Sequence, residues 1–355
     1  GSGIHVDHTM LSTGNQVKDN VLFNNEIQMS IGDASNYNGA GAVAPFHLSN
    51  FNDIYSGNTM YCLKKEQWCV LQLNVYGNNP VDFGTFTNNR YFNPWNEASI
   101  WVHNTFAGTH TYYTVEQLQQ ELGEDAGSTR SAQRLNAYGV TAELSGELVV
   151  NGTFNTNVTG WGGWPTNATA TRDLTYLDNG ALKAHIPNNS LYNVYTVRNP
   201  DQFAIANGQW YRMKFSLQSS GLGFVLAGTK GNSQLTGPNN IHQTRVPFSP
   251  ERREVELIFQ SNLGDNAMVQ FVNEYTDPMY WIDNVSVKRV SVSPIDPAVD
   301  HKLFYNDQAT ASTVTLPAGC WSDVNGNLFT GTMTLQPFTG KVLFYYTGSG
   351  CAVVP

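Results

Sequence analysis

The chain has 355 residues, more than a single hydrophobic core usually supports, so its length predicts two or three domains. Only 13% of the residues are charged, the net charge is −9 and no basic stripe is present, which excludes a nucleic-acid-binding surface because phosphate recognition needs clustered lysine and arginine. No stretch approaches about 18 consecutive apolar residues, so the sequence also excludes a transmembrane helix.

Glycine, asparagine, threonine, serine and tyrosine are abundant, which is typical of extracellular β proteins. We therefore expect the protein to be secreted or displayed on a cell surface. The start at Gly1–Ile4 has no signal peptide and has the character of a chain already inside a fold. We expect the chain to be a processed or truncated part of a longer polypeptide, with an upstream part as a partner.

The first segment, residues 1–142, repeats loosely with a period of roughly 30 residues. Apolar pairs bounded by asparagine recur at Asn20–Asn25, Asn52–Asn58 and Asn88–Asn93. Short strands with asparagine at recurring corners indicate a parallel β-helix, in which each coil stacks on the next and the corner amides form ladders. Together with the start Gly3–His8, these repeats resemble coils of right-handed β-helix proteins, many of which are polysaccharide lyases or glycoside hydrolases.

The clearest helix in the sequence is predicted at Thr114–Gly123. Thr114 and Gln117 have the spacing of a capping box, an apolar stripe begins at Val115, and Gly123 ends the helix. A stacked solenoid needs a cap, because its last coil would otherwise expose backbone and core. The helix is therefore predicted to close the last of the coils.

The second segment, residues 143–292, reads as a series of half-buried strands. Gly208–Leu217 and Glu254–Phe259 alternate apolar and polar residues with period two, as in strands of two facing sheets. The apolar start of Leu148–Asn155 predicts a first strand that ends in Asn-Gly, and Tyr280–Val287 predicts the last strand. With these motifs the segment resembles a β-sandwich carbohydrate-binding module of the family 4 and family 9 type.

This resemblance implies that the segment binds a polysaccharide, of plant or algal cell-wall type, by stacking sugar rings on aromatic side chains and orienting hydroxyls with amides. The predicted platform and its polar partners are Trp161, Trp164, Tyr192, Tyr195 and Trp210, with Gln218, Gln270 and Asn273. Gly162 and Gly163 leave the first two tryptophans little local cover, so these two lead the set. The alternative is that one of the pair seals the edge of the sandwich.

Modules of this resemblance commonly hold a structural calcium ion, which hard oxygen ligands bind. Asp283 matches the expected aspartate of the last strand, and Asn155 stands where the family usually has an acidic residue. The resemblance therefore implies a Ca²⁺ site that is weaker by one charge. The alternative for Asp283 is a plain carboxylate at a turn or sheet edge.

The third segment, residues 293–355, is predicted to be a small β domain behind the stiff linker Pro294–Pro297. Its stretch Cys320–Asn327 predicts a hairpin with an Asn-Gly turn. This segment resembles the small C-terminal β domains of many secreted glycoside hydrolases.

The four cysteines fall into two groups, Cys62 with Cys69 and Cys320 with Cys351. Neither group has the spacing of a zinc site, and an even number of cysteines in a β protein of this composition favours two disulfides. A domain as small as the third segment also needs such a covalent staple. Buried free thiols are the alternative.

For catalysis the only dense cluster is His5, Asp7 and His8. Alternation puts the first two on one face of a strand, where a metal site or an acid–base pair is geometrically feasible. A hydrolase needs a second carboxylate, which an upstream coil would have to supply. Solvated polar groups on an exposed face are the alternative to these weak candidates.

The sequence thus predicts an all-β protein with the last coils of a right-handed parallel β-helix and its helical cap, then a β-sandwich of jelly-roll type, then a small β domain. Its predicted function is noncatalytic polysaccharide binding in a multimodular carbohydrate-active protein. Two alternatives stay open: a structural or adhesive surface protein, and a polysaccharide lyase or glycoside hydrolase whose active site lies on the β-helix.

Overall fold

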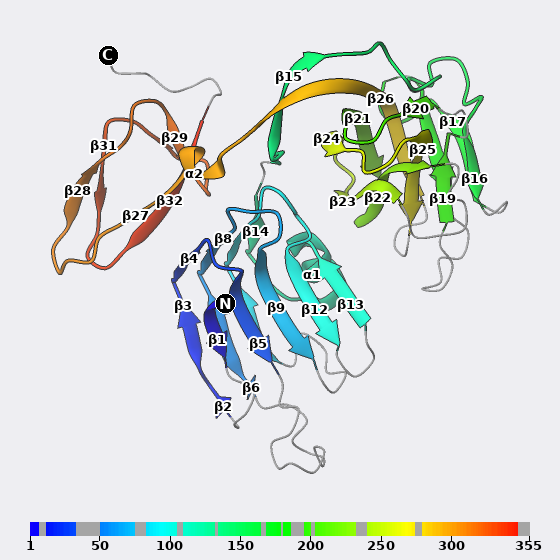
Figure 1. The fold of residues 1–355 in the computed structure, drawn as a ribbon. Helices are drawn as coiled ribbons and strands as arrows, with labels where there is room; N and C mark the ends of the chain where they lie inside the picture. Colours follow the sequence, from blue (N-terminus) through cyan, green and yellow to red (C-terminus); the bar gives the residue numbers. More distant parts are fainter. Residues whose placement is uncertain are drawn as a thin grey trace. The chain divides into compact units, whose positions relative to one another are not determined.

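The fold is all-β, with two short helices among the residues that the structure describes (Figure 1). The computed structural model describes residues 1–6, 12–32, 50–74, 83–104, 109–131, 134–164, 168–178, 180–185, 195–199, 203–231, 240–273 and 279–346. Contacts divide the chain into two compact units, residues 1–135 with 296–355 and residues 136–295. Each unit is described by itself below.

In the first unit, three sheets are built from strands that pair in parallel, in the orders β1-β5-β9-β12, β10-β7-β3 and β14-β11-β8-β4. Along the chain, successive strands visit the three sheets in turn, so that β3, β4 and β5 are followed by β7, β8 and β9 and then by β10, β11 and β12. An antiparallel strand, β13, completes the first sheet, and β2 pairs with β6. The bounds are β1 Ser2–Val6, β2 Ser12–Thr13, β3 Gln16–Lys18, β4 Val21–Phe23, β5 Ile27–Gly32, β6 Asn50–Phe51, β7 Asp53–Ser56, β8 Thr59–Tyr61, β9 Trp68–Asn74, β10 Gly84–Thr87, β11 Arg90–Phe92, β12 Ile100–Asn104, β13 Thr109–Tyr113 and β14 Thr129–Arg130.

A ladder of side-chain amides runs along one corner of these strands. Asn20 Nδ2 donates to Asn58 Oδ1 at 3.0 Å, and Asn58 Nδ2 donates to Asn89 Oδ1 at 3.1 Å. Asn89 Nδ2 in turn donates to Asp125 Oδ1 at 3.1 Å. The partners are 38, 31 and 36 residues apart in sequence, which confirms the predicted stacking of asparagine corners.

The helix predicted at Thr114–Gly123 is confirmed as α1, Val115–Leu122. Thr114 and Gln117 form both hydrogen bonds of the capping box, and Gly123 ends the helix in the left-handed conformation with φ of 69°. Val115 and Leu118 pack into the core between the sheets. Within the described ranges, neither helix is long and apolar enough to cross a membrane.

The C-terminal strands pack on the coils within the first unit. Phe92 stacks on Tyr61 with ring centroids 4.4 Å apart and on Phe344 at 5.4 Å, and Val342 is buried in the same cluster. The predicted hairpin is present, because β29 pairs with β30. The bounds are α2 Pro297–Asp300, β27 His301–Tyr305, β28 Ser312–Thr315, β29 Trp321–Asp323, β30 Leu328–Phe329, β31 Thr332–Leu335 and β32 Gly340–Tyr345. The third segment shares this buried cluster with the first segment. The predicted division into three separate domains therefore stays a prediction.

The cysteines differ from the prediction in one pair. Cys62 and Cys69 are buried free thiols with Sγ atoms 3.7 Å apart, so the predicted disulfide between them is not formed. Desolvation raises the pKa of Cys62, which keeps its thiol protonated. Cys320 is disulfide-bonded, but Cys351 lies outside the described residues, so that pairing stays a prediction.

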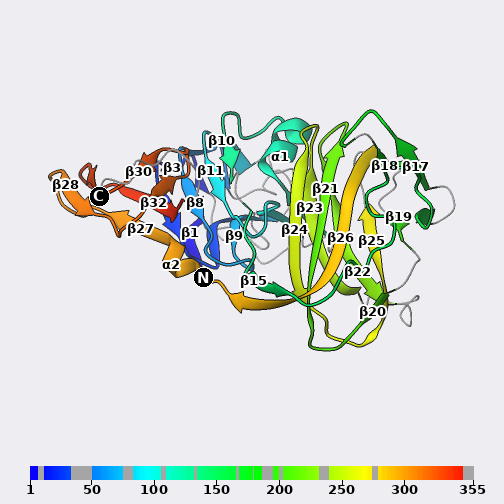
Figure 2. The same ribbon diagram turned by 90° about the horizontal axis from the view of Figure 1, so that it is seen from above.

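The second unit is a β-sandwich of two antiparallel sheets, as the sequence predicted. The first sandwich sheet has the order β17-β18-β26-β21-β24 with β15 beside β26, and the second sandwich sheet has the order β16-β19-β25-β22-β23 with β20 beside β25. Figure 2 shows the long strands β21 and β26 of the first sandwich sheet side by side. The bounds are β15 Tyr138–Glu143, β16 Gly162–Trp164, β17 Thr169–Asp173, β18 Ala181–His185, β19 Tyr195–Arg198, β20 Phe203–Ile205, β21 Trp210–Ser219, β22 Gly223–Gly231, β23 Asn240–Phe248, β24 Arg253–Gln260, β25 Asp265–Asn273 and β26 Met279–Pro294.

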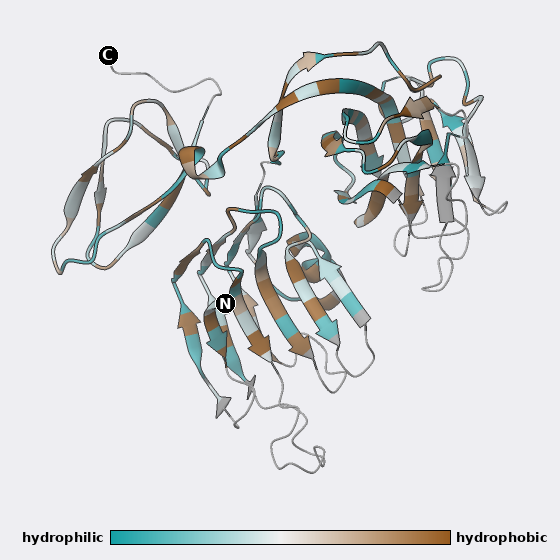
Figure 3. Ribbon diagram, viewed as in Figure 1, coloured by the Kyte–Doolittle hydropathy of each residue, from teal (hydrophilic) through white to brown (hydrophobic). Residues whose placement is uncertain are grey.

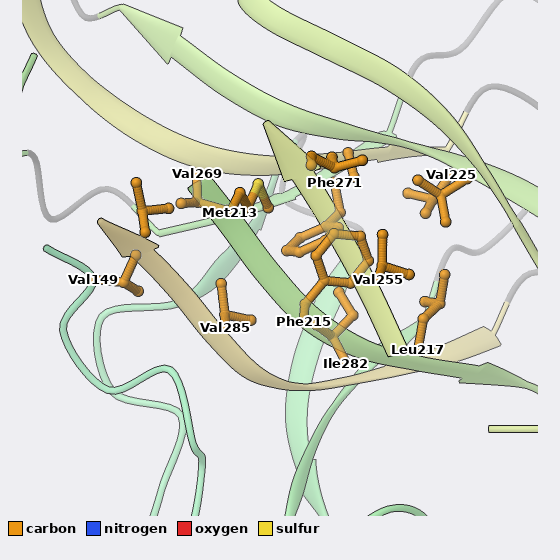
Figure 4. Close-up of a cluster of buried hydrophobic side chains, with 14 of the residues drawn as sticks. Val149, Met213, Phe215, Leu217, Val225, Val255, Val269, Phe271, Ile282 and Val285 are labelled. Atoms are coloured by element: carbon orange, nitrogen blue, oxygen red, sulfur yellow. The ribbon is translucent and has the colours of Figure 1, made fainter. Parts of the chain in front are cut away.

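Alternating side chains fill the space between the two sheets. Met213, Phe215 and Leu217 from β21 meet Val269 and Phe271 from β25, and all five are nearly inaccessible (Figure 4). In Figure 3 apolar and polar segments alternate along the strands. The strands predicted around Gly208–Leu217, Glu254–Phe259 and Tyr280–Val287 are confirmed as β21, β24 and β26.

The predicted first strand at Leu148–Asn155 is wrong. Asn151 and Phe154 have left-handed backbones, with φ of 53° and 49°, which interrupt an extended conformation. The segment has no regular strand and is tied to β26 by irregular backbone bonds, such as the one from Val285 N to Gly152 O at 2.8 Å. A Cβ at Gly152 would lie 1.9 Å from that strand's carbonyl oxygen of Val285, so only glycine fits there.

Candidate functional site

Four predicted sugar-binding residues lie on neighbouring strands of the second sandwich sheet. Trp164 is on β16, Tyr195 on β19, and Gln270 and Asn273 on β25. The backbones of Tyr195 and Asn273 are directly opposite each other in the sheet. Of these four side chains the structure describes only that of Gln270, which is 5% exposed. Tyr192 lies outside the described residues.

Trp161, one of the two leading candidates, is a core residue. Its side chain is 8% exposed. The centroid of its ring lies 5.2 Å from that of Phe154, in an edge-on contact, and 6.3 Å from that of Phe271. Its indole Nε1 donates to the carbonyl oxygen of Asn151 at 3.0 Å. A ring that is enclosed on its faces offers no surface to a sugar, which corrects its assignment to the platform.

Trp210 and Gln218 belong to the first sandwich sheet, on the opposite side of the core. The Trp210 ring packs against Tyr138 at 4.2 Å, and Gln218 Nε2 donates to the carbonyl oxygen of Pro250 at 2.7 Å. Both side chains therefore stabilise the sandwich itself. They do not join the predicted residues of the second sandwich sheet.

Around Gln270 the second sandwich sheet presents a row of residues in register. Five strands contribute one position each, and we call this set the Gln270 row: Gly162, Arg198, Gln270, Gly228 and Gln243. Val269 and Phe271 on either side of Gln270 are in the core, so the row faces away from it.

Two positions of the Gln270 row are glycines, so no side chain rises above the sheet there. A Cβ at Gly162 would meet no atom within 4 Å, so space is open above this position. At Gly228 a Cβ would lie 1.9 Å from the carbonyl oxygen of His242, so the close neighbouring strand excludes any larger residue. The neighbouring Gly163 points the other way, because its Cβ would lie 1.8 Å from the carbonyl oxygen of Ala168.

The next row on the same face adds apolar surface and a second guanidinium. Val272, Leu226 and Arg245 are in register, and the Arg245 Cζ lies 5.1 Å from the centroid of the Phe224 ring. Arginine stacked on an aromatic ring has fewer rotamers to lose when it donates to a ligand. Amide and guanidinium donors beside small apolar patches suit a ligand rich in hydroxyl groups.

Hydrolysis of a glycoside needs two carboxyl groups on either side of the bond. Among the described side chains of the Gln270 row and of the row beside it there is no carboxylate.

The expected calcium ligand Asn155 is not arranged for a metal. Its side chain is exposed, and Nδ2 donates to Thr153 Oγ1 at 3.3 Å. Arg172 donates from Nε to the carbonyl oxygen of Phe154 at 2.8 Å and from Nη2 to that of Asn155. A guanidinium cation thus already satisfies the carbonyl oxygens of this segment.

The other expected ligand, Asp283, is buried in a different hydrogen-bond network. It is 1% exposed and accepts the backbone N–H of Asn284 at 2.7 Å. Burial raises the pKa of Asp283 to about 6, and the negative charge of Asp178 adds to the rise. Asp178 is itself held by both arms of Arg252, which with Asn284 lowers the pKa of Asp178 to about 2.

These contacts do not fit a calcium ion at the predicted ligands. Where the chain is described, no group of three or more histidine, cysteine, aspartate or glutamate side chains is placed to hold a metal. Calcium therefore stays an untested prediction of the resemblance, and Arg172 takes the place of a cation beside Asn155.

Of the weak catalytic candidates, the structure describes only His5. His5 is exposed on β1, opposite Ser30 of β5, and Asp7 and His8 lie outside the described residues. Their catalytic role stays a prediction.

Sequence reasoning missed Arg198, Gln243 and Arg245. The alternation in the stretch Asn240–Phe248, in which Val246 and Phe248 are core residues, was the signal that could have found the last two. Arg198 is the last residue of the short strand β19, whose register only the folded sheet reveals.

No protein-family profile matches the chain, and no curated protein matches it. Among solved structures, it is similar to an arabinose-bound α-L-arabinofuranosidase, with a TM-score of 0.35 and 12% identity over 40% of this chain and 26% of that one. It is also similar to the CBM22-1 xylan-binding domain of Xyn10C from Paenibacillus barcinonensis, with a TM-score of 0.33 and 10% identity over 43% of this chain and 100% of that one. A cyclase from Fischerella sp. TAU gives a TM-score of 0.34 and 9% identity over 42% of this chain and 97% of that one. At such values a likeness carries no functional conclusion, so function has to be argued from the site.

Proposed function

We propose that the unit of residues 136–295 binds a polysaccharide reversibly, without cleaving it, on the outward face of the second sandwich sheet. The observation that carries the proposal is the Gln270 row. It brings Arg198, Gln270 and Gln243 into register across the sheet and ends at Gly162, above which space is open. Trp164, two residues after Gly162 on β16, is the aromatic residue that we assign to this face.

We further propose that the coils of the first unit are the end of a right-handed parallel β-helix. The parallel pairing in three sheets, the ordered visits of successive strands to each sheet and the ladder through Asn58 and Asn89 support this assignment. In this account the protein is secreted or on a cell surface, and its ligand is a cell-wall polysaccharide of plant or algal type. Binding by the sandwich unit raises the local concentration of the attached coils at the glycan.

A structural or adhesive role is the second candidate, and the amide ladder favours it. Buried amides linked along a corner stiffen a stack of coils without any ligand. Rod-like assemblies of the purified chain in electron micrographs without glycan would support this second candidate.

The proposed function is tested by closing the open space in the Gln270 row. In Gly162→Leu a side chain enters space that is empty, so the fold should persist while the sugar is blocked. Gly146→Leu is the matched control, because a Cβ at exposed Gly146 also meets no atom within 4 Å. Affinity electrophoresis in gels with xylan, β-glucan, pectin or alginate should show retention of wild type and Gly146→Leu and about tenfold weaker retention of Gly162→Leu.

Two results would contradict the proposal. One is a wild-type chain that migrates through every polysaccharide gel as it does through a gel without polysaccharide. The other is equal retention of Gly162→Leu and Gly146→Leu on the polysaccharide that the wild type binds.

A further inference from the structure

Five aromatic rings gather on the sheet of the first unit that contains β9, β12 and β13. We call this set the aromatic array: Trp68, Trp101, His103, His110 and Tyr112. The Trp68 ring lies 5.3 Å from that of Trp101 and 5.2 Å from that of Tyr112, and the two imidazoles are stacked at 4.2 Å. Three neighbouring strands therefore bring together residues that are up to 44 positions apart, from 68 to 112.

The array faces away from the core. Val70, Ile100 and Val102, which alternate with array positions on the same strands, are buried. Trp101 and Tyr112 are opposite each other across β12 and β13, and each keeps part of its surface exposed. The packing of the core thus does not require these rings.

One hydrogen bond joins two rings of the array. Trp101 Nε1 donates to His110 Nδ1 at 3.1 Å, so the proton of His110 is on Nε2. Burial, and to a lesser degree the neighbouring His110, lowers the pKa of His103 below its usual value. Strands β9, β12 and β13 have no charged residue in their sequences.

We propose that the aromatic array is a second carbohydrate-binding surface, which takes an uncharged stretch of a polysaccharide through the apolar faces of its pyranose rings. Aromatic rings with polar edges match a ligand that has C–H faces and a hydroxyl rim. A phosphate-rich ligand does not match, because the strands of the array offer no lysine or arginine. This surface is separate from the Gln270 row and does not depend on it.

The test uses the full chain and a ring-for-aliphatic exchange. Trp101→Leu keeps an apolar side chain but removes the ring, and Trp68→Ala is a second variant with the same purpose. Tyr305→Ala is the matched control, since Tyr305 is 66% exposed and belongs to no ring cluster among the described residues. Near-ultraviolet circular dichroism and thermal midpoints establish that each variant is folded.

Affinity electrophoresis on xylan and on neutral β-glucan is then run in the Gly162→Leu background, in which binding by the sandwich is weakened. We expect retention of Gly162→Leu on at least one of these glycans, the same retention with Tyr305→Ala added, and about tenfold weaker binding with Trp101→Leu added. No retention of Gly162→Leu on either glycan would overturn the proposal of a second surface while leaving the Gln270 row intact.

Two further results would also overturn it. One is equal retention of the Trp101→Leu, Trp68→Ala and Tyr305→Ala combinations. The other is concentration-dependent association of the wild-type chain in sedimentation that Trp101→Leu abolishes while glycan retention is unchanged, which would make the array a contact between copies of the chain.

Discussion

The buried side chain of His301 should make the stability of the C-terminal strands depend on pH. Its ring is 5% exposed, Nδ1 is hydrogen-bonded to the hydroxyl of Tyr61, and the Phe344 ring lies 6.3 Å away. Burial raises the pKa of Tyr61, so its hydroxyl keeps its proton and donates to the neutral imidazole. Burial lowers the pKa of His301 to about 4, well below the usual 6.5 of an imidazole.

The sign and size of the effect follow from this lowered pKa. In the unfolded chain the imidazole takes up its proton as the pH falls through 6.5, whereas the folded chain resists protonation until about pH 4. The contribution of neutral His301 to the free energy of unfolding is therefore fully present above pH 6.5 and is lost as the pH falls from 6.5 to 4. A shift of this size corresponds to about 3 kcal/mol of unfolding free energy.

The assay compares the free energy of unfolding in urea of the wild type and of His301→Phe at pH 7 and pH 4. Hydrogen exchange of the β27 and β32 amides reports the unfolding of the first unit. The wild type should lose about 3 kcal/mol more than the variant between the two pH values. Proton resonances of the His301 ring should report a midpoint near pH 4. Equal losses in the two proteins, or a ring that titrates near pH 6.5, would refute the reasoning.

Three other predictions concern the cysteines, the cation site and the amide ladder. Unfolding without reductant should expose two reactive thiols per chain, those of Cys62 and Cys69, whereas the folded chain should react at neither. Four reactive thiols or none after unfolding would contradict the assignment of these two cysteines as buried free thiols. EDTA should leave the thermal midpoint of unfolding unchanged, and a midpoint that EDTA lowers and Ca²⁺ restores would contradict this. Arg172→Met should destabilise the sandwich by about 1 kcal/mol, because two carbonyl oxygens lose a charged donor. Asn58→Ala should destabilise the first unit by about 2 kcal/mol in urea unfolding, since Asn58 is fully buried and the variant loses its side-chain hydrogen bonds to Asn20, Val17 and Asn89. A change below roughly 0.5 kcal/mol would show that the ladder does not stabilise the first unit.

Local signals in the sequence were sufficient for several elements. The capping box of Thr114 and Gln117 and the terminal Gly123 involve residues within ten positions of each other, so their spacing alone predicts α1. The strands β21, β24 and β26 followed from period-two alternation. The corner amides at Asn58 and Asn89 were predictable because their repeat is visible along the chain.

The candidate site was harder to predict because distant contacts decide it. The glycines beside Trp161 suggested exposure, but its burial depends on Phe271, which is 110 residues away. Arg198 joins Gln270 only through the register of β19 and β25. In the same way, the sequence did not reveal that Arg172 donates to the carbonyl oxygen of Asn155, the residue that the resemblance offered as a calcium ligand.

The central claim, that the outward face of the second sandwich sheet binds a polysaccharide, is tested most directly by backbone amide chemical shifts. The deuterated, ¹⁵N-labelled wild-type chain is titrated with a soluble oligosaccharide of the glycan that retains it in affinity gels. The account predicts that the largest shift changes in residues 136–295 fall at Gly162, Arg198 and Gln270, with little change along β24 of the first sandwich sheet. Largest changes along β24, or no changes in residues 136–295 while the oligosaccharide is bound, would contradict it.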